Sequence, residues 1–284
     1  MKQVFIIAEI GVNHNGSLSK AYKLISEAKK AGANAVKFQS FIAEKIVTTF
    51  AKKANYQIDS KTFDKNQFNM LKKLEIDFEF QKKIFEFAKH KKIHFLSSPF
   101  DLDSIEFLSK LNLNIFKIPS GEITNIPYLK KIGKLKKKII LSTGCSKISE
   151  IKIAIDLLNK FGTPKKNITL LHCTSAYPAP LNQVNLNSMA FMKNKFNVNV
   201  GYSDHTIGFE VPIAAVALGA VIIEKHFTLN KKMRGPDHKV SLNPKEFKQM
   251  VLFIRNIEKT IGKYDKFVTK SELKNMSKIR KSIY

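Results

Sequence analysis

The sequence predicts a TIM (β/α)8 barrel, a closed ring of eight parallel strands surrounded by helices. Eight short apolar runs, rich in β-branched and aromatic residues, alternate with amphipathic segments of helical periodicity. The 284-residue chain is long enough for eight such units. No G-x-G-x-x-G turn follows the first run, so a doubly wound, dinucleotide-binding open sheet is the less favoured alternative.

The predicted strands follow one another at the spacing that βα units require. They are the runs at 4–11, 35–41, 93–100, 115–121, 138–144, 168–175, 198–206 and 221–228. Ser17 is the expected N-cap of the first helix, and Gly32 is its expected stop. Gly162 closes a later helix, and Pro244 lies near the first turn of the last one. We therefore expect each strand to be followed by its own helix.

Two segments depart from the βα repeat. Residues 42–78, after the second strand, are polar and lysine-rich, and we expect them to form a lid or rim over the barrel mouth. Residues 263–284 read as a polar connector and a short basic helix. The sequence thus predicts one barrel domain over residues 1–262, with a linker and helix after it.

Composition excludes several classes of protein. Hydrophobic residues make up 44% of the chain, which does not fit a disordered protein, and no apolar run is long enough to cross a bilayer. The net charge is +26, but the lysines are spread over all predicted helices, and arginine occurs only at Arg234, Arg255 and Arg280. We therefore expect no nucleic-acid partner and no membrane partner, although the basic field should attract small anions. Two cysteines, Cys145 and Cys173, predict reduced thiols and a cytoplasmic location.

Two lysines lie inside predicted strands, where a charge is unfavourable unless an anion meets it. Lys37 and Lys117 are each flanked by apolar residues of a buried strand. In a TIM barrel the carboxyl ends of the strands carry the chemistry. Serines stand at several of these ends, at Ser98, Ser120, Ser142, Ser175 and Ser203. One such serine is more often a cap or turn residue, but the set predicts a pocket for phosphate or carboxylate.

Two neighbouring predicted strands end in histidine, at His205 and His226. Two neutral imidazoles with open positions suit Mn²⁺, Fe²⁺, Zn²⁺ or a similar divalent ion. Glu9 lies on the first strand, which closes the barrel beside the eighth, and can add a carboxylate to such an ion or to its bound water. At this point a metal site and a purely structural role for the histidines stay equally open.

Eight motifs at the predicted strand ends together resemble the N-acetylneuraminate (sialic acid) synthase family. They are IAEIGVNHNGS, AVKFQSF, FKIPSGEITNIPYL, IILSTG, LLHCTSAYPAP, VGYSDHTIG, ALGAVIIEKHFTL and GPDHKVSL. The resemblance runs in order from about residue 4 to 262, and the segments AKKANYQ and PSGEITNIPYLKKIGKL are similar to the N,N'-diacetyllegionaminate synthase branch. Within the family, pseudaminate and plain N-acetylneuraminate synthases remain alternatives.

The resemblance implies a transferase that condenses phosphoenolpyruvate with an open-chain N-acylated mannosamine-type sugar. Its products would be a nine-carbon 2-keto sugar acid and phosphate, and the legionaminate branch implies 2,4-diacetamido-2,4,6-trideoxymannose as the acceptor. The enol carbon attacks the aldehyde, water adds to the resulting oxocarbenium-like carbon, and a carboxylate should deprotonate that water. Glu9 is the first candidate for this base and Glu122 the second.

The resemblance also implies roles for other residues. Phosphoenolpyruvate would lie among Lys37, Ser98, Lys117, Ser120, Ser142, Ser175 and Ser203. Tyr177 and Asp237 match positions that handle the sugar, with Asn55 as a weaker candidate in the rim segment. His205 and His226 would hold Mn²⁺ or Mg²⁺ as a Lewis acid for the aldehyde oxygen.

Two departures from the family pattern bear on these expectations. Cys145 stands where the family usually has methionine, and we expect an effect on packing alone. Family members continue into a C-terminal antifreeze-like domain, which lends an arginine to the partner's active site in a domain-swapped homodimer; Tyr284 stands where it would begin. We therefore expect a homodimer in full-length form, and little or no turnover but retained phosphoenolpyruvate and metal binding for this chain alone.

Two alternatives lie outside the synthase family. A barrel hydrolase using two histidines and a carboxylate is one, although such sites often carry an early H-x-H pair, which this sequence lacks. The other is a catalytically impaired barrel that acts only as a binding module through its basic surface. Release of phosphate from phosphoenolpyruvate only in the presence of an aldehyde sugar separates the synthase from the hydrolase. Salt-dependent retention on nucleic acid or anionic lipid, with no metal bound, would favour the binding module.

Overall fold

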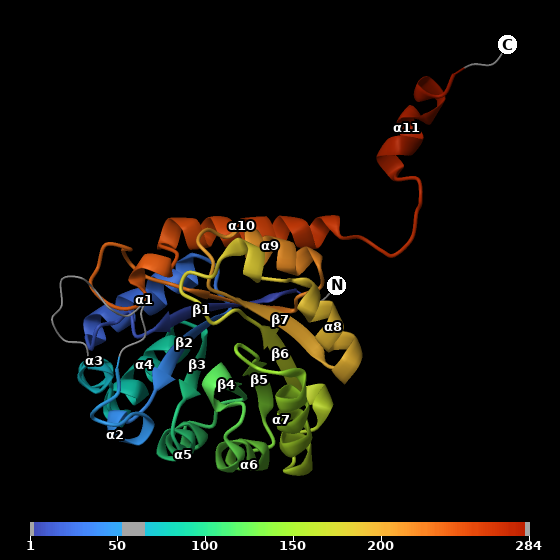
Figure 1. Ribbon diagram of the computed structural model, residues 1–284. Coiled ribbons are helices and arrows are strands. Elements are labelled where there is room, and N and C mark those ends of the chain that lie inside the picture. Colours follow the sequence, from blue (N-terminus) through green and yellow to red (C-terminus); the bar gives the residue numbers. More distant parts are fainter. Residues whose placement is uncertain (1–2, 53–65, 282–284) are drawn as a thin grey trace.

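The computed structural model describes residues 3–52 and 66–281 and confirms the predicted barrel (Figure 1). Eight parallel strands are paired in the order β3-β2-β1-β8-β7-β6-β5-β4, and the end strands β3 and β4 contact each other to bring the ring nearly to closure. The strands are β1 (Phe5–Gly11), β2 (Ala35–Ser40), β3 (His94–Pro99), β4 (Ile115–Ile118), β5 (Lys138–Ser142), β6 (Ile168–His172), β7 (Asn199–Asp204) and β8 (Ile222–His226). Each of them lies within one of the eight predicted runs.

Helices surround the strands and shield their outer faces (Figure 1). They are α1 (Leu18–Lys30), α2 (Ala43–Ile46), α3 (Gln67–Leu74), α4 (Phe78–His90), α5 (Leu102–Lys110), α6 (Ile126–Lys134), α7 (Ile148–Lys160), α8 (Asn187–Phe196), α9 (Glu210–Ala217) and α10 (Pro244–Thr260). The short helices α2 and α3 belong to the extra segment after β2, which the sequence predicts as a rim. No helix in the described ranges is long and apolar enough to span a membrane.

The predicted helix boundaries agree with the structure. Ser17 caps α1 by accepting a hydrogen bond from Lys20 N, and α10 begins at Pro244. Gly32 and Gly162 follow the ends of α1 and α7 with φ of +90° and +120°, a conformation that glycine adopts without strain. These local signals therefore fix where the helices begin and end.

The interior of the barrel is layered, and this layering places the functional residues. Ile7, Ala35, Ile140 and Ile222 belong to a buried apolar cluster that is separate from the large core between strands and helices. Side chains two positions apart on a strand share a face. The residues two positions further on are Glu9, Lys37, Ser142 and Glu224, and all of them are buried. A polar layer therefore rests directly on an apolar one, toward the carboxyl ends of the strands.

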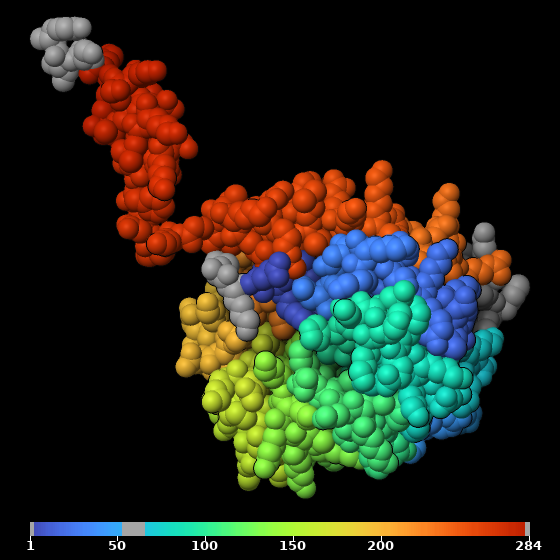
Figure 2. Space-filling view, turned by 180° about the vertical axis from the view of Figure 1, so that it is seen from behind, coloured from blue at the N-terminus to red at the C-terminus, as the bar shows by residue number. Residues whose placement is uncertain are grey.

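The chain leaves the barrel after α10. The next helix, α11 (Lys270–Ile279), stands away from the body of the barrel, as Figures 1 and 2 show from opposite sides. Apolar side chains of this region are well exposed, among them Phe267 at 54% and Ile279 at 77%. The predicted polar connector and short basic helix are thus present, and the helix makes no part of the barrel core.

Candidate active site

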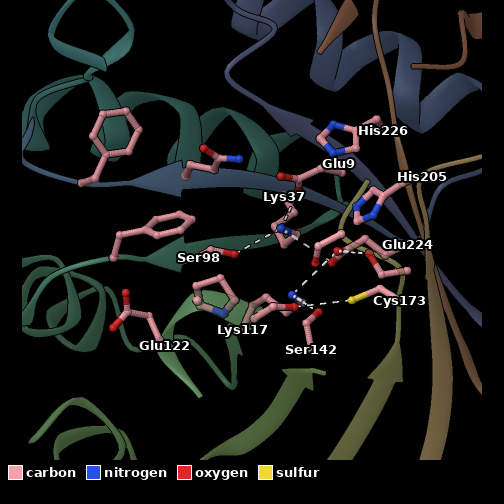
Figure 3. A pocket seen from close by; sticks show the side chains of 18 of the residues that line it. Glu9, Lys37, Ser98, Lys117, Glu122, Ser142, Cys173, His205, Glu224 and His226 are labelled. Atoms are coloured by element: carbon pink, nitrogen blue, oxygen red, sulfur yellow. Dashed lines mark hydrogen bonds and ion pairs between the residues drawn. The ribbon is translucent and has the colours of Figure 1, made fainter. Parts of the chain in front are cut away.

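A pocket of about 420 Å³ opens at the carboxyl ends of the strands (Figure 3). All eight strands or the turns that follow them contribute to its lining. It brings together Glu9, Lys37, Ser98, Lys117, Ser120, Glu122, Ser142, Ser175, Tyr177, Ser203, His205 and His226, all of which the sequence singles out. The pocket also reaches Ile46, Val47, Gln67 and Leu71, so the described part of the rim segment forms one of its walls.

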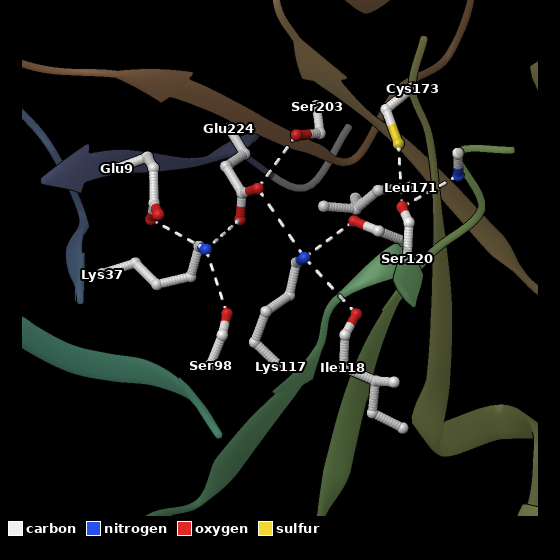
Figure 4. Close-up of polar contacts among 12 residues, drawn as sticks. Glu9, Lys37, Ser98, Lys117, Ile118, Ser120, Leu171, Cys173, Ser203 and Glu224 are labelled. Atoms are coloured by element: carbon white, nitrogen blue, oxygen red, sulfur yellow. Dashed lines mark hydrogen bonds and ion pairs between the residues drawn. The ribbon is translucent and has the colours of Figure 1, made fainter. Parts of the chain in front are cut away.

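Four charged side chains form a network at the floor of the pocket (Figure 4). Lys37 Nζ lies 2.8 Å from Glu9 Oε2 and 3.7 Å from Glu224 Oε2. Lys117 Nζ lies 3.7 Å from Glu224 Oε1. All four residues are at most 5% exposed. Glu224 therefore lies between two ammonium groups, and Glu9 is bound to one of them.

Serine hydroxyls complete the surroundings of the two lysines. Lys37 Nζ donates a hydrogen bond to Ser98 Oγ at 3.1 Å, and Lys117 Nζ donates one to Ser142 Oγ at 2.7 Å. Ser203 Oγ donates to Glu224 Oε1 at 2.9 Å. Ser120 Oγ accepts a hydrogen bond from Gly144 N at 2.9 Å. The serines thus hold the two ammonium groups in fixed positions. An anion that enters the pocket can accept hydrogen bonds from the same lysines and serines.

Burial and charge give the two glutamates opposite protonation behaviour. Burial raises the pKa of Glu9 to about 7, against the opposing charge of Lys37. Burial also acts to raise the pKa of Glu224, but the positive charges of Lys117 and Lys37 and the bond from Ser203 hold it at about 2. Glu224 is therefore a permanent anion at neutral pH, whereas Glu9 exchanges protons near neutrality.

The two histidines meet at one side of the pocket, with ring centroids 5.7 Å apart. Burial lowers the pKa of both imidazoles, so both are neutral. His205 Nδ1 lies 2.8 Å from the carbonyl oxygen of Thr174, which can only accept, so this nitrogen carries the proton and Nε2 keeps a lone pair. His226 Nδ1 is buried and has no hydrogen-bond partner among the described residues. One nitrogen on each ring is thus open to a ligand.

The residues predicted for the sugar are placed differently from one another. Tyr177 lines the pocket and packs on His205, with ring centroids 4.2 Å apart. Asp237 does not line this pocket and is buried beside Gly11, where a Cβ atom added to the glycine would lie 3.7 Å from the Asp237 carboxylate and 3.2 Å from that of Glu9. Burial raises the pKa of Asp237 to about 6. Asn55 lies outside the described residues.

Glu122, the second candidate for a catalytic base, lies at the rim. It ends a short 3₁₀ turn (Ser120–Glu122) after β4, and its carboxylate accepts a hydrogen bond from Asn125 Nδ2 at 2.7 Å. Figure 3 shows it on the far side of the pocket from Glu9 and the histidines. Its position separates it from the lysine–glutamate network.

The sequence pattern predicts no role for Glu224, although this residue is the centre of the network. A glutamate inside a buried apolar run, two positions before His226, is the signal that points to it. Cys173 also reaches the pocket, and its thiol lies 3.4 Å from Ser120 Oγ. Burial raises the pKa of this thiol, so it stays protonated.

Comparisons with known proteins agree with this arrangement. The chain is 55% identical to the N,N'-diacetyllegionaminic acid synthase of Campylobacter jejuni, over all of this chain and 85% of that one. It is 39% identical to a pseudaminic acid synthase of the same species, over 96% and 79% of the two chains. The N-acetylneuraminic acid (sialic acid) synthetase of Leptospira borgpetersenii, solved as a crystal structure, matches with a TM-score of 0.85 and 34% identity, over 98% of this chain and 91% of that one.

A family model gives the same assignment over a continuous stretch. The NeuB family model matches residues 24–266, which include all strands from β2 to β8 and the histidine pair. This stretch is well over half of the chain, and the relatives extend the match to the remaining strand. The chain belongs to the NeuB family.

Proposed function

We propose that this chain condenses phosphoenolpyruvate with an open-chain N-acylated mannosamine-type sugar to give a nine-carbon 2-keto sugar acid and phosphate. The similarity to N,N'-diacetyllegionaminic acid synthases, at 55% and 44% identity, favours 2,4-diacetamido-2,4,6-trideoxymannose as the acceptor. Pseudaminic acid synthases are less similar, at 39% identity or below. The proposed activity is therefore a synthase of the legionaminic acid type.

The observation that carries this proposal is the pair of buried lysines at the pocket floor. Lys37 and Lys117 bring two ammonium groups to the pocket floor, Glu224 is ionised beside them, and Glu9 carries only part of a negative charge near pH 7. The excess positive charge and the serine hydroxyls favour a small dianion. Phosphoenolpyruvate carries a phosphate and a carboxylate. All seven residues predicted for it line the pocket: Lys37, Ser98, Lys117, Ser120, Ser142, Ser175 and Ser203.

The reaction requires one proton acceptor, and Glu9 fits this role. Carbon 3 of the enol forms a bond to the aldehyde carbon of the sugar, and carbon 2 becomes electron-poor. Water adds to carbon 2 and gives one proton to Glu9, which balances the proton gained by the former aldehyde oxygen as it becomes a hydroxyl group. The C–O bond to phosphate then breaks, the remaining proton of the added water leaves with the phosphate, and the 2-keto acid forms. A pKa of about 7 suits a group that must accept and release a proton near neutral pH.

His205 and His226 are the proposed ligands of a divalent ion, Mn²⁺ or Mg²⁺. Their neutral rings, the open nitrogen on each and the 5.7 Å separation of the ring centroids fit such an ion. No group of three or more His, Cys, Asp and Glu side chains in the described ranges is arranged to hold a metal, so its other ligands would come from substrate and water. When bound, the ion would supply a Lewis acid for the aldehyde oxygen.

The sugar is proposed to bind between the histidines and the rim. Tyr177 packs on His205 at this side, and Asp237 lies beside Gly11, as Glu9 does, within the electrostatic reach of Lys37. Asn55 stays a prediction from the rim segment. The hydroxyl and acetamido groups of the sugar would meet Tyr177 while its aldehyde faces the pocket floor, and Asp237 would reach them only from the edge of the pocket beside Gly11.

The proposal extends to assembly and location. We infer a homodimer, supported by the exposed apolar side chains of α11 and its connector, which a second copy would cover. Light scattering on the purified protein tests this assembly. Two free thiols and a phosphoenolpyruvate substrate support a cytoplasmic location.

The test is a phosphate-release assay with phosphoenolpyruvate and three acceptors, run with and without a supplied C-terminal antifreeze-like domain and scored by the mass of the keto acid formed. The acceptors are N-acetylmannosamine, 2,4-diacetamido-2,4,6-trideoxymannose and the diacetamido sugar that yields pseudaminic acid. We expect phosphate release only when an acceptor is present, and the highest kcat/KM with the trideoxymannose. Release without any acceptor would indicate a phosphatase, and a preference for another acceptor would reassign the substrate.

A further inference from the structure

An ion pair that the proposed reaction does not use lies behind the wall of the pocket. Asp204 and Lys225 are register partners on β7 and β8, and Lys225 Nζ donates to Asp204 Oδ2 at 2.5 Å. Both side chains are 0% exposed. Replacing such a buried pair by apolar residues of similar size often leaves a protein equally stable or more stable. Stability alone therefore does not explain the pair.

The pair and the pocket lie on opposite faces of the same two strands. Successive side chains of a strand alternate between its faces. The residues on either side of the pair line the pocket: Ser203 and His205 on β7 and its end, and Glu224 and His226 on β8. Asp204 and Lys225 therefore point away from the pocket, toward the helical layer.

Both charges also hold the backbone beyond His205. Thr206 donates twice to the carboxylate of Asp204, from its backbone N to Oδ1 and from its Oγ1 to Oδ2, each at 3.0 Å. Lys225 Nζ donates to the carbonyl oxygen of Thr206 at 2.5 Å. His205 is thus fixed through both of its neighbours, and the lysine that fixes it is the residue directly before His226.

We propose that Asp204 and Lys225 are positioning residues, whose ion pair holds the imidazoles of His205 and His226 at the separation needed to share one ligand. The contact between His205 Nδ1 and the Thr174 carbonyl sets the rotation of one ring, and the ion pair sets the relative position of the two backbones. The inference rests on the proposed function only for the identity of the ligand, a divalent cation.

The test is the double variant Asp204→Asn/Lys225→Met in the otherwise complete protein. It removes both charges together, and the asparagine oxygen can still accept from Thr206 N. We expect the Kd for Mn²⁺, measured by calorimetry without substrates, to rise by roughly 10- to 100-fold, while the circular dichroism spectrum is retained. In the metal-free protein, the side-chain nitrogen resonances of His205 and His226 should also change.

A matched control removes an ion pair at the opposite end of the barrel. Arg255 and Glu258 are 2.8 Å apart, mostly buried, and bound to Val4 just before β1. We expect Arg255→Met/Glu258→Gln to leave the Mn²⁺ affinity and the histidine resonances unchanged. An equal loss of Mn²⁺ affinity in this control would show that general destabilisation is the cause, and it would overturn the positioning role.

A milder variant covers the case in which the double variant does not fold. Thr206→Val keeps both charges and removes one donor to Asp204, and we expect severalfold weaker Mn²⁺ binding. Wild-type affinity in the folded double variant, or in Thr206→Val if the double variant is unfolded, overturns the inference. If the wild type neither binds Mn²⁺ nor releases phosphate, the proposed function fails. In that case the positioning role is judged from the side-chain nitrogen resonances of His205 and His226 in the metal-free protein. Resonances that are the same in the double variant and the wild type overturn it.

Discussion

Glu9 combines a buried position, a lysine partner and a pKa of about 7. We expect Glu9→Gln to lower kcat by about 10²- to 10⁴-fold, because an amide cannot accept the proton of the attacking water. In the wild type, kcat should fall as the pH drops below 7, where Glu9 becomes protonated. A pH–rate profile with phosphate release as the readout checks both statements.

Glu122 supplies the control for this experiment, because its carboxylate lies at the rim and is bonded to Asn125. Glu122→Gln should retain most of the wild-type kcat and the same pH profile. A large loss of kcat in Glu122→Gln, together with a mild effect of Glu9→Gln, would exchange the two roles.

Asp237, the proposed sugar contact, should reduce the free energy of unfolding at neutral pH, because its carboxyl group is buried. Burial raises its pKa from 3.8 to about 6, so the fold favours the protonated form. The protonated Asp237 side chain contributes about 3 kcal/mol to the free energy of unfolding relative to the ionised one. This contribution is fully present below pH 4 and is lost as the pH rises through 6. Asp237→Asn should therefore unfold at a higher temperature than the wild type at pH 8, and at a similar temperature at pH 4.

The same variant should weaken the proposed sugar contact. We expect a higher KM for the sugar and an unchanged KM for phosphoenolpyruvate, measured by varying each substrate in turn. Thermal melts at the two pH values give the stability comparison. A variant that is less stable than the wild type at pH 8 would show that the aspartate is satisfied as an anion in the folded protein.

At the scale of elements, the turn after β5 contains Gly144, where there is no room for a side chain. A Cβ atom on Gly144 would lie 2.1 Å from Ser175 Oγ, 2.9 Å from Ser120 Oγ and 3.0 Å from Cys173 Sγ. The backbone there is not left-handed, so alanine is not strained by its φ, but the hydroxyl and thiol groups around the added methyl group must shift to make room. We expect Gly144→Ala to raise the KM for phosphoenolpyruvate by about 10-fold or more, measured by initial rates.

Gly121 is the matched control for this substitution. It lines the pocket itself, but a Cβ atom built on it meets nothing within 4 Å. Gly121→Ala should therefore leave the KM for phosphoenolpyruvate near that of the wild type. Equal effects of the two substitutions would mean that the space beside Gly144 does not hold the anion.

The alternation of strand residues explains how much of the site the sequence predicts. Because every second residue of a strand points inward, lysines inside apolar runs and histidines at strand ends had to meet at one end of a closed barrel. Lys37, Lys117, His205 and His226 meet as predicted. The strands and the helix boundaries also follow from local signals, namely apolar runs, caps and glycine stops.

Loops do not follow from such local rules. The loop after β8 carries Asp237, and its path depends on contacts with a turn more than 200 residues away in sequence. Asn13 donates to Phe227 O and to Ser241 Oγ, and Asn15 donates to Arg234 O. No periodicity predicts these pairs, and so the sequence pattern could not predict that Asp237 lies beside Gly11, outside the lining of the pocket.

At the scale of the whole molecule, the net charge of +26 should act on phosphoenolpyruvate before it reaches the pocket. The Debye length falls from about 30 Å at 0.01 M salt to about 3 Å at 1 M, so the field of distant lysines is screened as salt is added. We expect kcat/KM for phosphoenolpyruvate to fall by about 10-fold between 0.01 M and 0.5 M salt. The sugar carries no charge, and its KM should change little over the same range.

Surface lysines at the two ends of the barrel separate this long-range field from the two lysines inside the pocket. Lys52 and Lys73 are exposed on the rim segment, and Lys138 and Lys166 are exposed near the amino-terminal ends of β5 and β6. Lys52→Gln/Lys73→Gln should reduce kcat/KM for phosphoenolpyruvate at low salt more than Lys138→Gln/Lys166→Gln does, because only the first pair lies near the mouth. At 0.5 M salt both double variants should match the wild type. Identical behaviour of the two variants at low salt would show that the position of these surface lysines does not matter, and it would overturn steering toward the mouth.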